Sequence, residues 1–292
     1  MKVLPLAARN DSRIAFKRRL TSNEEKEMMQ ITKEAKDLLG NTGNSVLILH
    51  DACLPLSEEK NVGVANLLSK DAESFFDFAK TYFGVNTIQV FPQGEFVRRK
   101  HKNGLVCPYS YSALGLNDSL IDLETLTHDS WRKILLPKEF VEVVKANDAI
   151  DKNSLVNFEN INDEESVFQK NLRLAFDRFV QLKDTDELKV EFEAFKAENN
   201  DWLEPKAIYS ILQKQNNGKH HDFWLYGRDT KLYDNRVYKE KFLSAKREEY
   251  LEKNQYDAEF YKFKQFVADK HLAQARENLH AKGLQLFRIV SK

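Results

Sequence analysis

The segment from Cys107 to Leu123, CPYSYSALGLNDSLIDL, carries the residue types best suited to holding a ligand. It combines a Pro-Tyr pair, small hydroxyl side chains and two turns rich in Asn and Asp, which is more turn chemistry than a core segment needs. The ring of Tyr109 can stack on an apolar ligand face while its hydroxyl group hydrogen-bonds to a ring substituent. The alternative is that Tyr109 only packs the loop onto the fold. Asn117 and Asp122 are predicted to be turn and cap residues.

A second candidate group follows the apolar run SVLILH at residues 45–50. His50 and Asp51 would stand at the carboxyl end of this strand, the end at which parallel-sheet enzymes place their chemistry. For His50 we favour the alternative, a histidine hydrogen-bonded to backbone. Nothing in the sequence around Cys107 would lower the pKa of its thiol, so a small buried thiol is favoured over a nucleophile.

Carboxylate pairs are too frequent to identify a catalytic site. The chain has 45 Asp and Glu residues, and a pair such as Glu58-Glu59 stands in a polar stretch typical of a solvated surface. The two cysteines, Cys53 and Cys107, form neither a CxxC motif nor a Cys/His metal spacing. We therefore predict no metal site and no cofactor, and assign no catalytic residue.

The charge balance of the 292-residue chain excludes several classes of partner. Its 45 basic residues equal its 45 acidic ones, so no net field attracts nucleic acid or an anionic membrane. The basic run at residues 98–102 has no interleaved aromatic residues and is interpreted as surface. The low cysteine content, and the absence of a signal peptide or an apolar run long enough for a membrane span, predict a soluble cytoplasmic protein.

Two apolar runs with a helix between them predict a βαβ unit. Residues 45–50 and 86–91 are the predicted strands, and the first reads as buried on both faces. The helix between them is predicted to begin after Ser69 and to end at Gly84. The two strands should be parallel and joined by a right-handed crossover.

Further helices are predicted on both sides of this unit. Ser22-x-x-Glu25 reads as a capping box that opens a helix ending at Gly40. From about residue 135 to 281, helix follows helix, with many Lys, Glu and Phe residues and few Gly or Pro. The run at 284–290 predicts a third strand.

In these segments the sequence resembles the amylomaltase or disproportionating-enzyme family, the 4-α-glucanotransferases of glycogen and maltodextrin metabolism. VLILHDACLPL keeps His50, Leu54 and Pro55 of the family's first-strand pattern His-Pro-Thr-Ser-Leu-Pro. CPYSYSALGLNDSLIDL is similar to the signature Ser-Pro-Tyr followed by Ser-Ala-Phe-Ala-Gly-Asn and Leu-Ile-Asp-Leu. NDWLEPKAIYSILQKQNNGKHHDFW resembles the family's Trp-Leu-Glu-Asp-Tyr-Ala helix. Similar segments follow one another in family order from about Val46 to Val290.

The resemblance implies an α/β fold that is mostly helical overall. We expect part of a (β/α)8 TIM barrel, with about three parallel strands and a large helical insertion. The expected parts are an N-terminal helical extension at 1–44, a first βαβ part of the barrel with the substrate loop at 45–134, a helical subdomain at 135–283, and a truncated third barrel strand at 284–292.

The resemblance also suggests what the candidate residues bind. Tyr109 matches the family's tyrosine that contacts sugar beside the scissile bond, and Cys107, His50 and Asp51 join it as candidate substrate-binding residues for α-1,4-glucans. An aromatic group could line a glucan groove, although it could equally form the core of the helical subdomain. Its members are Trp202, Phe223, Trp224 and Tyr226.

Departures from the family pattern limit this expectation. Ala65-Asn66 replace the Gly-Asp of the first loop, and GLVC lacks the aromatic residue that in some members helps form a second glucan site. The family's nucleophilic Asp, acid/base Glu and transition-state Asp follow its third strand. We therefore expect all three to lie beyond Lys292, and the chain to be inactive alone.

Three hypotheses for function follow. The first is the front part of a 4-α-glucanotransferase acting by retaining glycosyl transfer, with a complementary C-terminal polypeptide as a partner. The second is a non-catalytic glucan-binding or regulatory relative. The third is an unrelated helical interaction protein, which would be favoured if residues 45–91 formed no parallel βαβ unit.

Overall fold

The computed structural model describes residues 21–96 except 39, 41 and 42, residues 111–150, residues 163–218 except 164, residues 221 and 224, and residues 230–233 and 241–288. Several candidates from the sequence lie outside the described residues: the basic run at 98–102, Cys107, Tyr109, Phe223 and Tyr226.

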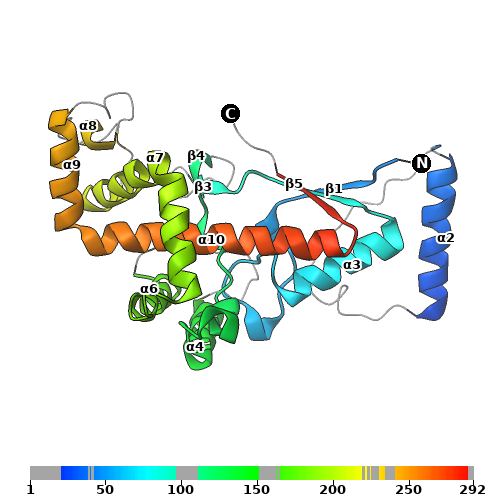
Figure 1. Ribbon diagram of the computed structural model, residues 1–292. Helices are drawn as coiled ribbons and strands as arrows, with labels where there is room; N and C mark the ends of the chain where they lie inside the picture. The colour runs from blue at the N-terminus through cyan, green and yellow to red at the C-terminus, as the bar shows by residue number, and fades with distance from the viewer. Residues whose placement is uncertain are drawn as a thin grey trace.

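A small parallel sheet contains the predicted strands. Its order is β1 (Val46–Leu49), β2 (Thr87–Val90) and β5 (Gln285–Arg288), and both strand pairs are parallel. Helix α3 (Lys70–Phe83) connects β1 to β2. The parallel βαβ unit expected from the apolar runs is therefore confirmed, and the third predicted strand joins it at the edge of β2 (Figure 1).

Helices form most of the remaining described chain. The others are α2 (Ser22–Leu38), α4 (Pro137–Ile150), α6 (Val167–Val180), α7 (Glu187–Gln215), α8 (Thr230–Tyr233), α9 (Lys241–Lys253) and α10 (Gln255–Ala281). Short 3-10 helices are η1 (Asp51–Cys53), η2 (Glu58–Lys60), η3 (Asp118–Leu120), η4 (Thr125–Thr127) and η5 (Asp129–Trp131). Within the described residues, no helix combines the length and apolar character needed to span a bilayer.

Helix α7 (Glu187–Gln215) is continuous through an internal proline. Pro205 stands inside the helix, where it has no N–H to donate and its ring crowds the preceding turn. Figure 1 shows that α7 changes direction along its length, as expected for a helix with an internal proline.

The ends of α2 and α3 show how local sequence sets helix boundaries. Ser69 caps α3 by accepting a hydrogen bond from the backbone N–H of Ala72 (3.1 Å), as predicted. On α2 the capping box lies one residue earlier than predicted. The Thr21 hydroxyl accepts from the N–H of Glu24 (3.3 Å), whose carboxylate accepts from the N–H of Thr21 (2.8 Å). Glu25 is not available for this role because it accepts from the hydroxyl of Tyr82 on α3 (3.0 Å).

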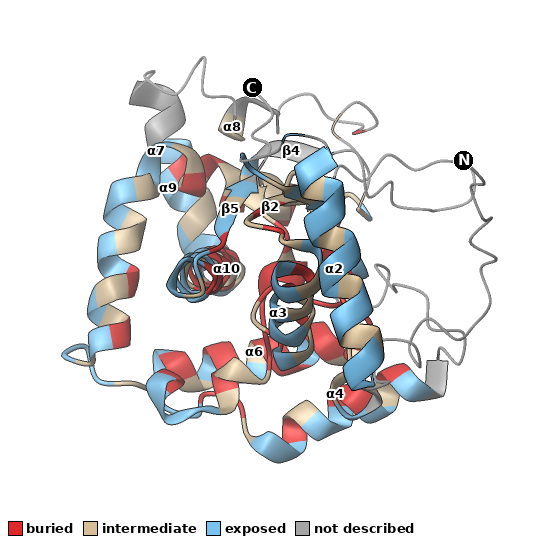
Figure 2. Ribbon diagram, turned by 90° about the vertical axis from the view of Figure 1, so that its right-hand side faces the viewer, coloured by how far each residue is buried: buried red, intermediate tan, exposed pale blue. Residues whose placement is uncertain are grey.

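One face of the edge strands β1 and β5 is exposed, although Thr87 on the same face of the central strand β2 is buried. In β1, Val46 and Ile48 are 48% and 58% exposed, whereas Leu47 and Leu49 pack against the core. Phe287 of β5, on the same face as Ile48, is 54% exposed. The prediction that the first strand is buried on both faces is therefore wrong for this chain. The reason is that α3 and α10 lie together on one side of the sheet (Figure 2).

A second sheet follows β2 and was not predicted. Strands β3 (Gly94–Phe96) and β4 (Tyr111–Leu116) pair antiparallel. Gln265 of α10 holds the end of β4, because its side chain accepts from the N–H of Leu116 (2.6 Å) and donates to the carbonyl of the same residue (3.0 Å). The helix thus supplies hydrogen bonds that a further strand would otherwise make.

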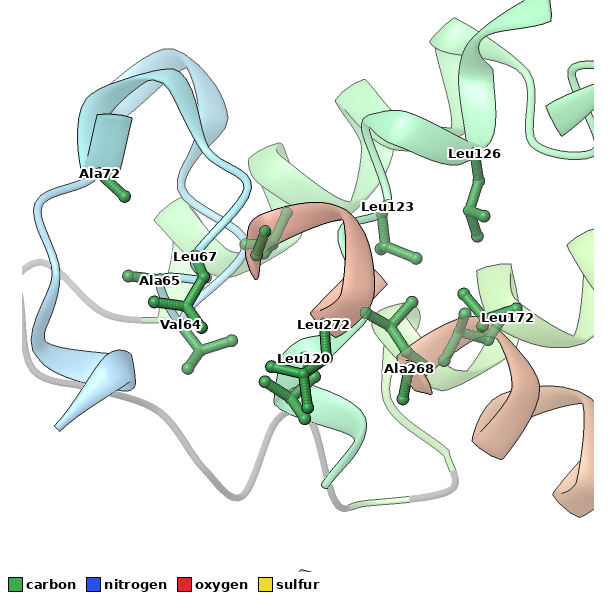
Figure 3. Close-up of a cluster of buried hydrophobic side chains, with 14 of the residues drawn as sticks. Val64, Ala65, Leu67, Ala72, Leu120, Leu123, Leu126, Leu172, Ala268 and Leu272 are labelled. Atoms are coloured by element: carbon green, nitrogen blue, oxygen red, sulfur yellow. The ribbon is translucent and has the colours of Figure 1, made fainter. Parts of the chain in front are cut away.

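One hydrophobic core links the βαβ unit to the helical segment. Figure 3 shows side chains from the stretch after β1, from the stretch around η3 and η4, from α6 and from α10 meeting in this core. Its aromatic part lies between α6, α7 and α10, where the ring of Phe179 lies 4.9 Å from that of Phe263 and 5.3 Å from that of Phe192. The helices therefore share one core with β1 and β2, the strands whose ends carry the candidate residues.

Candidate functional site

The candidate site is the rim where β1 and β2 end. We define the rim by His50 and Asp51 after β1, and Phe91 and Gln93 after β2. Carboxyl ends of neighbouring parallel strands meet at one edge of a sheet, which is where α/β enzymes bind ligands. The rings of His50 and Phe91 lie 6.0 Å apart between centroids, so the two strand ends are in contact.

His50 and Asp51 are both engaged by the turn that follows β1. The N–H of Ala52 donates to His50 Nδ1 (3.2 Å) and to Asp51 Oδ1 (2.9 Å). His50 is thus hydrogen-bonded to backbone, as favoured from the sequence. His50 Nδ1 also lies 3.1 Å from Asp51 Oδ1, so the two side chains are held together at the start of the turn.

Gln93 is a rim residue that the sequence analysis did not identify. Its side-chain amide is buried and donates to Asp51 Oδ2 (3.1 Å). The amide oxygen has no hydrogen-bond partner within the described part of the chain. A buried acceptor without a donor costs free energy, so it fits a position that a ligand hydroxyl group completes. The only sequence signal was its place just after a predicted strand.

Cys53 lies at the end of the rim turn with an exposed side chain. Desolvation and, after it, the negative charge of Asp51 raise the pKa of this thiol. The thiol therefore stays protonated near neutral pH, and it is unsuited to act as a nucleophile.

The turn residues of the candidate loop have the roles predicted for them. Asn117 caps η3, where its side-chain oxygen accepts from the N–H of Ser119 (2.9 Å). Asp122 accepts from the N–H of Glu124 (3.0 Å) and the hydroxyl of Thr125 (2.8 Å). Burial raises the pKa of Asp122 despite these hydrogen bonds, which lower it. Both side chains therefore fix the backbone of residues 117–125.

The described members of the aromatic group have structural contacts. Trp202 donates through Nε1 to the side chain of Asn199 (2.9 Å). Trp224 is buried against Ile208 and Leu212 of α7. For these two residues the structure supports the alternative noted above, a role in the core of the helical segment.

The rim residues can bind a polar ligand but include a single carboxylate, that of Asp51. Retaining glycosyl transfer needs two carboxyl groups about 5 to 5.5 Å apart. Both oxygens of Asp51 already accept hydrogen bonds. Among the residues that the structure describes, no group of three or more His, Cys, Asp or Glu side chains is placed to hold a metal ion. The described rim residues therefore present polar groups and one carboxylate that is already engaged.

Comparisons with known proteins identify the same family as the sequence motifs. The family model for glycoside hydrolase family 77, 4-alpha-glucanotransferase, matches residues 53–290. Among solved structures, the chain is similar to the amylomaltase from Streptococcus agalactiae in complex with acarbose, with a TM-score of 0.63 and 16% sequence identity. No curated protein matches the sequence significantly.

The structural match covers 84% of this chain but 43% of the amylomaltase. The chain thus spans less than half the length of that protein. At 16% identity the likeness shows the fold, which is mostly helical with a small parallel sheet, in agreement with the fold class expected from the sequence.

Proposed function

The chain belongs to the 4-alpha-glucanotransferase family, and on that premise we propose that it binds α-1,4-glucans as one part of an enzyme that transfers glucan segments by retaining glycosyl transfer. The observation that carries the proposal is the rim itself. Two parallel strands end side by side there, and the buried amide of Gln93 leaves an acceptor for a sugar hydroxyl group.

In this proposal the rim orients one glucose unit. Gln93 Oε1 accepts from a sugar hydroxyl group, and the rings of His50 and Phe91 form an apolar wall beside it. Tyr109 and Cys107, which precede β4 in the sequence, are the further sugar-binding residues that the family resemblance implies. Tyr109 stacks on the sugar face next to the bond that is cleaved.

The chemical step in this proposal needs carboxylates that the rim does not supply. The nucleophilic Asp forms a covalent glucosyl intermediate, and the Glu transfers the proton, a contribution of roughly 10² to 10⁴-fold in rate. We propose that a complementary C-terminal polypeptide brings both, and that it covers the open face of the sheet. The support is the match to 43% of the amylomaltase chain and the exposure of Val46, Ile48 and Phe287.

A non-catalytic glucan-binding relative is the second candidate. It fits the same rim, because binding needs the acceptor of Gln93 and no catalytic carboxylate. The third hypothesis required that no parallel βαβ unit be present, and that condition is not met in residues 45–91. The two remaining candidates differ in whether a complementary polypeptide restores turnover.

The test is the release of glucose from maltotriose. We expect no release by the purified chain alone, and release when the product of the reading frame immediately downstream is added. In the mixture, Tyr109→Ala should lower turnover about fivefold, since lost stacking is worth roughly 1 kcal/mol. Tyr256→Ala, at the start of α10, is the control for loss of a tyrosine elsewhere in the chain. Glucose release by the chain alone would contradict the proposal that the catalytic carboxylates come from another polypeptide. Maltotriose binding without turnover in any mixture would favour the non-catalytic relative.

A further inference from the structure

A polar pocket of about 270 Å³ lies between α7, α10, η3 and β3. This volume is close to the lower end of the roughly 300 to 1,000 Å³ that small-molecule sites occupy. We call it the α7/α10 pocket and define it by Glu95, Asn117, Asp118, Tyr209, Tyr261 and Lys264. It contains none of the rim residues, and its size suits a ligand of one or two sugar rings.

The charges around the pocket compensate one another. Asp118 is paired with Lys264 (2.7 Å), and Glu95 is paired with Lys206 (2.6 Å). Asp163 adds a third carboxylate to the lining. The lining also contains Lys214, which is paired with Asp257 (3.3 Å). A phosphate or another anion would meet three carboxylates and two lysines that are already paired, whereas a neutral ligand would find paired charges with remaining acceptor capacity. The lining therefore favours a neutral ligand rich in hydroxyl groups.

One buried donor in the lining has no acceptor within the described part of the chain. It is the side-chain amide nitrogen of Asn117, a residue that is 3% exposed. Burial, followed by the charge of Glu95 and a hydrogen bond with its carboxylate, raises the pKa of Tyr261 well above its usual value, so the phenol keeps its proton beside that carboxylate. A buried donor without a partner is uncommon, and a ligand oxygen would satisfy the amide of Asn117.

Gly115 of β4 lets the backbone approach these groups closely. A Cβ atom at this position would lie 3.0 Å from the Tyr261 hydroxyl oxygen and 3.0 Å from the carboxyl carbon of Glu95. Its φ of +84° is also a conformation that side chains disfavour. The carboxylate and the phenol are thus kept beside one stretch of backbone without a side chain between them.

Tyr209 supplies an aromatic wall whose position is fixed. Its ring lies 5.0 Å from that of Tyr233 and 5.6 Å from that of Trp224, and the ammonium group of Lys206 lies 5.3 Å from its centroid. An aromatic ring held in this way can stack on the apolar face of a sugar without losing side-chain entropy on binding.

We propose that the α7/α10 pocket binds one or two units of a neutral sugar through Tyr209, Asn117, the side-chain amide of Gln213 and the carboxylates of Glu95 and Asp118. The choice of a glucose-based sugar rests on the proposed function. The pocket is connected to the rim, because the N–H of Asn117 donates to the carbonyl of Gln93 (2.9 Å), the residue whose side chain contacts Asp51. A sugar chain held in the pocket would therefore be anchored near the rim.

The test uses maltose as the probe and saturation-transfer NMR on the full 292-residue chain, titrated to give a Kd. Ser210→Phe places a ring in the pocket at a lining position, and Gln213→Leu removes an amide of similar size from the lining. The matched control is Gln215→Leu, the same change on the same helix at a position that does not line the pocket. Far-UV circular dichroism and thermal melting check that each variant is folded.

We expect Ser210→Phe to remove saturable binding, Gln213→Leu to raise the Kd about fivefold for one lost hydrogen bond, and Gln215→Leu to leave it unchanged. Inorganic phosphate should not compete. Equal affinity in folded Ser210→Phe and the parent chain would overturn the pocket proposal. If Gln93→Leu weakened maltose binding in that case, the rim of the proposed function would stand. Absence of maltose binding by the parent chain would count against both.

Discussion

His271 of α10 shows how a single buried group sets the behaviour of this fold with pH. Its Nδ1 accepts a hydrogen bond from the N–H of Asp122 (3.0 Å). The centroid of the Trp131 ring lies 5.1 Å from that of the imidazole, with the two rings nearly perpendicular. Its Nε2 has no partner among the described residues. Burial lowers the pKa of His271 to about 3. The folded chain therefore contains the neutral imidazole, which accepts through Nδ1 from the loop that follows the candidate segment.

We predict that acid destabilises the chain through His271. The unfolded state binds a proton near the ordinary pKa of about 6.5 and the folded state does not, so stability is present above pH 6.5 and falls as pH decreases toward 3. Between pH 7 and pH 5 this group alone should remove about 2 kcal/mol of unfolding free energy. Urea unfolding at both pH values measures the loss.

His271→Asn is the control for this prediction, because its side-chain oxygen can replace Nδ1 as an acceptor and does not titrate. The difference between pH 7 and pH 5 should be smaller in this variant by about the same amount. An unchanged pH dependence would show that the imidazole is not the group responsible.

At the scale of elements, one ion pair connects α4 to α6. The Nη2 and Nη1 atoms of Arg178 donate to the carboxylate of Glu139, at 2.6 and 2.7 Å, and Nη1 also donates to the carbonyl of Ile134 (3.0 Å). The hydrogen bonds from Arg178 are the largest influence that lowers the pKa of Glu139. The backbone N–H of Leu136 completes the partners of this carboxylate (2.8 Å).

We predict that Arg178→Ala destabilises the chain by about 2 kcal/mol, because it leaves a buried carboxylate with one partner. The value is below the roughly 3 to 5 kcal/mol of a fully buried pair, since the Arg178 side chain is 35% exposed and water screens the pair. Urea unfolding at pH 7 gives the measurement. Lys253→Ala, which breaks an exposed pair with Glu249 (2.5 Å), should cost much less, because water screens this pair on all sides. Equal costs for the two variants would contradict the buried character of the Glu139 site.

Elements defined by neighbouring residues were predictable from sequence, and those defined by distant partners were not. Ser69 and Gly84 bound α3 through contacts within a few residues, so the pattern identified both. The end of β4 depends on Gln265, 149 residues away in sequence, and no local signal marks it. Gln93 likewise belongs to the rim because its partner Asp51 comes from another strand.

The whole molecule is asymmetric about its main sheet. Leu47, Ile88 and Leu286 face the core that α3 and α10 complete, whereas Val46, Ile48 and Phe287 face away from it. The alternation of buried and exposed residues along β1 could not be predicted, because its sequence is apolar throughout. Which face of the strand is covered depends on helices that are distant in the sequence. Both β1 and β5 are also edge strands in the three-stranded order. An exposed apolar face next to open edges is the arrangement that promotes association between chains.

We therefore predict that the isolated chain self-associates through this face. Ile48→Thr and Phe287→Thr keep a residue that suits a strand and remove apolar surface, so together they should shift the chain toward monomer without weakening the fold. Light scattering during size-exclusion chromatography, over a range of concentrations, measures the shift. Val190→Thr on α7, where the side chain is 55% exposed but lies on a helix away from the sheet, is the matched control. A parent chain that stays monomeric at all concentrations would mean that the apolar face alone does not drive association. If the double change also weakened restoration of activity by a complementary polypeptide, the same face would be the surface that the polypeptide covers.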